Sequence, residues 1–77
     1  MTQPTTKDLT IKRVDRVMEE AVWLNDIHIG RLLYDWKTEN ITAWPDAGRP
    51  RVFFPANRDQ AQQHLINQYL KNKEIWP

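Results

Sequence analysis

The first third of the chain carries apolar residues at three- and four-residue spacing. The residues in this stripe are Ile11, Val14, Val17, Met18, Ala21 and Val22. Such spacing predicts a helix over about residues 8–20. Leu9 and Ile11 also fit a short strand that precedes the next hairpin, because β-branched residues favour strands. The pattern therefore predicts an N-terminal helix and leaves an extra strand as the alternative.

Residues 21–34 show the pattern of a β-hairpin. Segments 21–24 and 27–34 are rich in β-branched and aromatic residues, and they flank Asn25-Asp26, which tolerates the positive φ angles of a two-residue turn. This turn pairs Leu24 with Ile27 and then Trp23 with His28, followed by Val22 with Ile29 and Ala21 with Gly30. The register predicts one aliphatic face and one aromatic face, and the alternation extends the aromatic face to Tyr34 and Trp36. Gly30 permits a bulge that would reverse these faces beyond it.

Two further strands and a helix follow from the remaining pattern. Strands are expected at residues 41–44, which end before Pro45, and at residues 51–54, which end before Pro55. Asn57 with Gln60 three residues later suits a helix start, and an apolar stripe continues to about Lys73. That stripe consists of Ala61, Leu65, Ile66, Tyr69 and Leu70.

The predicted fold is α+β, with a small antiparallel sheet of three or four strands. The C-terminal helix packs on one face of this sheet, and the N-terminal segment adds a helix or an extra strand. Residues 1–7 have no periodic apolar pattern and are expected to form a flexible tail. With 77 residues in all, residues 8–77 have the length of a single domain.

Composition narrows the classes of function. The chain has no cysteine and a formal net charge of +1, so neither disulfides nor the strong positive field of a dedicated nucleic-acid binder is expected. No apolar run approaches the roughly 20 residues of a membrane span, and the N-terminus lacks an apolar signal region. We therefore expect a cytoplasmic protein that does not enter membranes.

The residues that usually carry catalysis are sparse. The chain has no serine, and its two histidines, His28 and His64, do not show metal-site spacing. Gly30 and Gly48 are the only glycines, so no glycine-rich phosphate loop exists. We expect no enzymatic activity, no metal and no cofactor.

Two features point to binding instead. Four tryptophans are many for so small a domain, and exposed tryptophan and arginine dominate protein-binding hot spots. Segment 49–58 carries three arginines and no acidic residue, which suits phosphate contacts. The candidate partner-binding residues are Trp36, Trp44, Arg49, Arg51 and Arg58.

The near-neutral charge and abundant tryptophan favour a protein partner, so the leading hypothesis is a protein-binding adaptor or inhibitor that is a monomer or weak homodimer. The alternative is a nucleic-acid-binding module that uses segment 49–58 and aromatics of the sheet. The order of hairpin, third strand and C-terminal helix resembles that of small DNA-binding domains that read DNA with a sheet, such as the arm-binding domains of some recombinases. Small binding proteins are also common in phages and plasmids, which makes such an origin an expectation.

Overall fold

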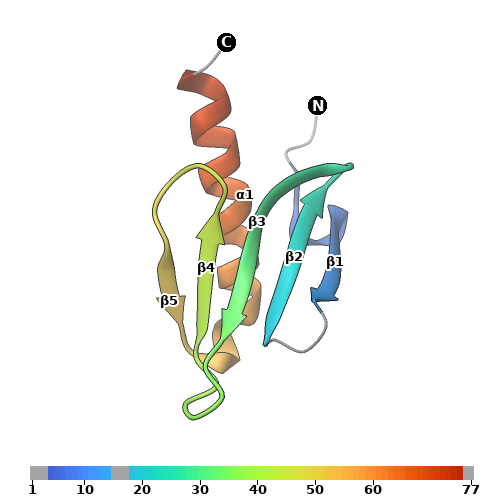
Figure 1. Cartoon of the computed structure of the whole chain (residues 1–77). Coiled ribbons are helices and arrows are strands. Elements are labelled where there is room, and N and C mark those ends of the chain that lie inside the picture. The colour runs from blue at the N-terminus through green and yellow to red at the C-terminus, as the bar shows by residue number, and fades with distance from the viewer. Residues whose placement is uncertain (1–3, 15–17, 76–77) are drawn as a thin grey trace.

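The computed structural model describes residues 4–14 and 18–75. It contains one antiparallel sheet of five strands in the order β1-β2-β3-β4-β5, followed by one C-terminal helix (Figure 1). The strands are β1 (Leu9–Val14), β2 (Glu19–Leu24), β3 (Ile27–Tyr34), β4 (Ile41–Pro45) and β5 (Arg51–Phe53), and the helix is α1 (Arg58–Ile75). Short 3-10 turns, η1 (Thr6–Asp8) and η2 (Pro55–Asn57), precede β1 and α1. The predicted α+β class is confirmed, with five strands rather than three or four.

Residues 9–14 and 19–20 lie in strands, so the N-terminal helix predicted over residues 8–20 is wrong and the alternative of an extra strand is right. Residues 15–17 of that prediction lie outside the described residues. β1 pairs along its whole length with β2, with Leu9 opposite Leu24 and Ile11 opposite Val22. Both β1 residues pack against the core, while Thr10 and Lys12 between them are exposed. A two-residue alternation with a partner strand available outweighs the helical spacing, because each pairing satisfies backbone groups and buries one face.

The predicted hairpin is confirmed at residues 21–34. Asn25 and Asp26 both adopt positive φ angles, 50° and 70°, as a tight two-residue turn requires. The predicted pairs Leu24–Ile27 and Trp23–His28 are observed. Beyond them the predicted register is wrong, because Val22 lies opposite Gly30 and Ala21 opposite Arg31.

The cause of this shift is a bulge that leaves Ile29 without a directly opposite residue on β2. The bulge reverses which residues of β3 face each side. Leu32 is completely buried in the core, and Tyr34, two residues later, shares its face. Tyr34 therefore does not continue the aromatic face with Trp23, as the alternation without a bulge predicted.

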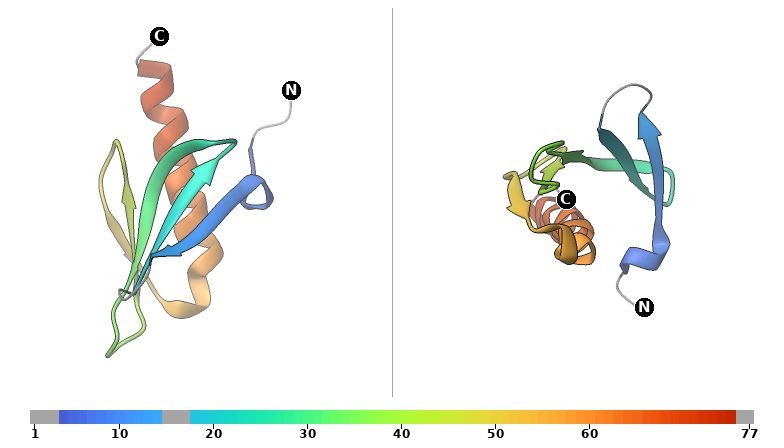
Figure 2. Two further views of the ribbon diagram at one scale, coloured as in Figure 1. Left: turned by 45° about the vertical axis from the view of Figure 1, so that its right-hand side comes forward. Right: turned by 90° about the horizontal axis from the view of Figure 1, so that it is seen from below.

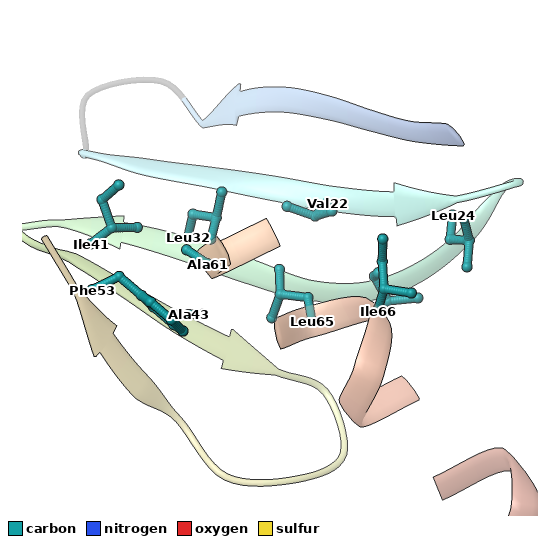
Figure 3. Close-up of a cluster of buried hydrophobic side chains, with 10 residues drawn as sticks. Val22, Leu24, Leu32, Ile41, Ala43, Phe53, Ala61, Leu65 and Ile66 are labelled. Atoms are coloured by element: carbon teal, nitrogen blue, oxygen red, sulfur yellow. The ribbon is translucent and has the colours of Figure 1, made fainter. Parts of the chain in front are cut away.

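The sheet curls around α1, which lies in its concave side (Figure 2). The core between them is formed by buried residues from β2 to β5 and by one stripe of α1 (Figure 3). The helical stripe predicted from the sequence is confirmed, since Ala61, Leu65 and Ile66 are fully buried and Tyr69 and Leu70 pack beside them. The sheet residues in the core are Val22, Leu24, Ile29, Leu32, Ile41, Ala43 and Phe53.

Candidate functional site

The convex side of the sheet faces away from α1 (Figure 2). On this side, opposite residues of β3, β4 and β5 form one row. Leu33 lies opposite Thr42, and Thr42 lies opposite Val52. One step along the strands, Arg31 lies opposite Trp44. Directly opposite residues share a face of the sheet, and so do residues two apart on a strand. We call these five residues the convex patch.

Two apolar side chains of the convex patch are exposed to solvent, while Leu33 is half-buried. Val52 is 59% exposed and Trp44 is 42% exposed. Phe54, which follows β5, is 69% exposed. Large apolar side chains that gather on one face mark interaction surfaces more often than isolated ones do.

Two cations of this face, Lys12 and Arg31, reach solvent, and so does the carboxylate of Asp46, which binds His28. Arg31 donates to Glu19 Oε1 at 2.9 Å, and the Glu19 side chain is only 15% exposed while that of Arg31 is 51% exposed. Lys12 Nζ lies 5.5 Å from the centre of the Trp23 ring, also on the convex side. The Glu19 carboxylate is thus largely covered, and the side chains of Lys12 and Arg31 remain available to a partner.

Both edge strands of the sheet are poorly suited to pairing with another strand. β5 has three residues and lies between Pro50 and Pro55, which lack backbone N–H donors. β1 presents exposed Lys12 and Arg13. Charged or proline-flanked edges oppose strand addition. A binding surface on the face of the sheet therefore fits this structure better than one on its edges.

Trp36 lies apart from the convex patch, in the turn between β3 and β4, and is 74% exposed. Asp35 Oδ1 accepts from the backbone N–H of Lys37 at 2.7 Å and of Thr38 at 3.2 Å, and Glu39 has a φ of 63°. These bonds give the turn a defined shape. Trp36 precedes β4 and Trp44 lies near its other end, so the structure places these two predicted residues at opposite ends of one strand.

The three predicted arginines do not form a single surface. Arg49 lies in the β4–β5 loop, where it lines a shallow hollow with Lys71. Arg51 lies opposite Ala43, on the concave side, and its guanidinium is 5.2 Å from the centre of the Phe53 ring. Arg58, at the start of α1, is bound to a glutamate of β2.

That glutamate is Glu20, and it joins three elements on the concave side. Arg58 donates to both carboxylate oxygens of Glu20 at 3.0 and 3.1 Å, and the Tyr34 hydroxyl donates to Oε1. Burial, followed by the hydrogen bond and the negative charge of Glu20, raises the pKa of Tyr34 to about 12 from 10.0. The hydroxyl therefore stays protonated, as a donor, across the physiological range.

Three residues of the convex patch, Leu33, Thr42 and Val52, were not predicted from the sequence, and neither was the Glu20–Tyr34–Arg58 cluster. Side chains of β3 alternate between the two sides of the sheet, and the bulge at Ile29 decides which of them beyond Gly30 lie on the convex side beside β4. The glycine was a signal that a bulge could occur, but it did not say where the extra residue would lie.

Within residues 4–14 and 18–75, no helix has the length and apolar character needed to cross a membrane. Among the described side chains, those of residues 4–14 and 18–72, no three histidine or acidic groups gather as metal ligands would.

Comparison of the chain with protein-family models, with curated proteins and with solved structures finds no match.

Proposed function

We propose that this chain is a non-enzymatic binding module that docks on a protein partner through the convex patch. The observation that carries the proposal is the open apolar row of Trp44 and Val52 on a sheet face that the one described helix does not cover. Aromatic and aliphatic side chains that are free of water in a complex supply most of the binding energy at protein interfaces.

The shape and charge of this face favour one kind of partner surface. Two convex surfaces touch over a small area, whereas a stable interface buries about 800 Å² on each partner. A second copy that used the same face would therefore fit poorly, and a concave partner surface would fit well. Lys12 and Arg31 are exposed at the face, and so is Asp46, which binds His28 opposite Trp23. Acidic groups placed opposite the two cations, around an apolar hollow, would therefore complement it.

The proposal is tested by comparing variants of the purified chain in capture from an extract of its own source cells. Trp44→Ala and Val52→Glu should each weaken recovery of the partner at least about tenfold, as expected for hot-spot residues. Gln60→Glu is the matched control, because it adds the same charge at an exposed position on α1. Equal recovery with Val52→Glu and Gln60→Glu, in variants that keep the circular dichroism of the parent chain, would reject the convex patch.

Nucleic acid is the second candidate partner, favoured by the cations that line the hollow beside the β4–β5 loop. Arg49 and Lys71 line this hollow with Gly48, Gln68 and Asn72. Titration with short DNA and RNA at two salt concentrations tests it, since phosphate contacts weaken steeply as salt rises. Salt-sensitive binding that Arg49→Glu abolishes would establish this candidate in place of the protein partner. Binding that does not depend on salt would rule it out.

A further inference from the structure

A cavity opens at the end of the sheet where β1, β2 and β3 approach the start of α1. It has a volume of about 230 Å³, and its lining includes Glu20 and Tyr34 of the concave side as well as Glu19, which binds Arg31 of the convex patch. Its lining combines apolar surface with charged groups. The lining residues are Arg13, Met18, Glu19, Glu20, Tyr34 and Arg58.

The two glutamates of this cavity are already compensated. Glu20 accepts from Arg58 and from the Tyr34 hydroxyl. Glu19 accepts from Arg31 at 2.9 Å. Neither carboxylate is therefore an open site for a cation, and the repulsion that each would exert on an incoming anion is reduced.

Arg13 is the group in the lining that remains uncompensated. It lies directly opposite Glu20 across the β1–β2 pair. With the described side chains, those of residues 4–14 and 18–72, it makes no ion pair or hydrogen bond. Arg58 adds a second positive charge beside Arg13. Its bonds to Glu20 use only the Nη2 group, so its other N–H donors can bind a ligand.

We infer that this cavity binds a carboxylate group carried on a small apolar body. The guanidinium of Arg13 would hold the carboxylate through two parallel N–H bonds, with Arg58 beside it. Met18 and the ring of Tyr34 would contact the apolar body. The volume is below the range of about 300–1,000 Å³ typical of drug-sized ligands, so the ligand has the size of one amino-acid residue.

Two sources present this chemistry: a small organic acid, and the C-terminal residue of a polypeptide. Titration of the ¹⁵N-labelled chain with N-acetyl-leucine tests the shared chemistry, with N-acetyl-leucinamide as the uncharged control. The acid should give saturable amide shifts at Met18, Glu20 and Tyr34, and the amide should give none. Shifts that are the same for both compounds, or absent for both, would overturn the inference.

Variants of β1 link the binding to Arg13. Arg13→Gln should weaken the affinity about tenfold, the effect of losing a hydrogen bond to a charged group. Arg13→Lys should recover part of it, because it restores the charge without the guanidinium fork. Lys12→Gln is the matched control, since it removes the same charge from the next residue, on the opposite face. Equal affinity of Arg13→Gln and Lys12→Gln, with unchanged spectra elsewhere, would also overturn the inference.

A peptide that ends in leucine, compared with its amidated form, separates the two sources. Affinity for the free-acid peptide at least about tenfold above that for N-acetyl-leucine would identify a polypeptide terminus as the ligand. Affinities within about twofold would identify a small acid, because contacts beyond the terminal residue would then add less than about 0.4 kcal/mol. Either result requires that the amidated peptide fails to bind, and binding of the amidated peptide would contradict the site.

Discussion

Gly30 lies where β3 packs tightly against both β4 and α1. A Cβ atom at this position would lie 2.6 Å from the backbone oxygen of Trp44 and 2.7 Å from Leu65 Cδ2. The absence of a side chain therefore lets the helix rest on the sheet beside the bulge. No larger residue fits without moving the backbone of β4.

Gly30→Ala should accordingly lower the free energy of unfolding by about 2 kcal/mol, the cost of an added methyl group in a packed site. Urea denaturation measures it, and Thr10→Ala on the exposed side of β1 serves as the control. A loss below about 0.5 kcal/mol would show that the helix does not press on the sheet at this point.

Tyr34 makes the stability of the folded chain depend on pH in the alkaline range. Its pKa is raised to about 12 in the folded chain, so between pH 10 and 12 the unfolded chain loses the proton first. The stability from this group is complete below pH 10 and falls as the pH rises toward 12. Because the side chain is partly exposed, solvent screening limits the loss to the order of 1 kcal/mol.

Tyr34→Phe should remove this component. Parallel urea titrations of the parent chain and the variant at pH 9 and pH 11 measure the difference. The variant should be the less stable protein at pH 9, since Glu20 loses a donor, and the gap should narrow at pH 11. A gap that stays constant or widens would contradict the hydrogen bond to Glu20.

Among the elements, the hairpin and the C-terminal helix could be predicted from local sequence signals. Asn25-Asp26 has the chemistry of a tight turn, and the buried stripe of α1 is visible in the sequence as spacing alone. β1 was mistaken for a helix because its apolar residues fit both the helical spacing and the two-residue alternation of a strand. Its pairing with β2, which decides between the two, is a tertiary contact. The position of the bulge is likewise set by packing, so the faces of β3 could not be derived from the sequence.

Substitutions of Asp26 test the geometry of the β2–β3 turn. Asp26→Gly should raise the free energy of unfolding by roughly 0.5 kcal/mol, because glycine adopts the observed φ of 70° without steric cost. Asp26→Val should lower it, since a β-branched residue is strained there. Thermal unfolding of both variants measures these changes, and the reverse order would contradict the turn geometry.

At the scale of the whole molecule, the candidate site follows from how many faces of the sheet are covered. The sequence predicted Trp36 and Trp44 as partner-binding residues without establishing which tryptophans would be exposed. Because β1 replaces the expected helix, α1 alone packs on the described sheet, and the convex side stays open. That outcome depends on the complete fold, which explains why Leu33 and Val52 were not predicted.

The curvature also predicts the oligomeric state of the isolated chain. A convex patch cannot bury enough area against its own copy, and both edges of the sheet oppose strand pairing. Sedimentation equilibrium should therefore give a monomer mass up to concentrations of about 100 μM. A dimer that Val52→Glu dissociates would show instead that the partner of the patch is a second copy.

Site-specific photo-crosslinking from the convex patch tests directly whether this patch binds a protein. A benzophenone side chain at position 52, and in a separate variant at position 60 on α1, is activated in source-cell extract. We expect a discrete protein adduct from position 52 that Trp44→Ala abolishes, and no such adduct from position 60. An adduct from position 60 alone, or a nucleic-acid adduct in place of a protein, would contradict the assignment of the convex patch as a protein-binding surface.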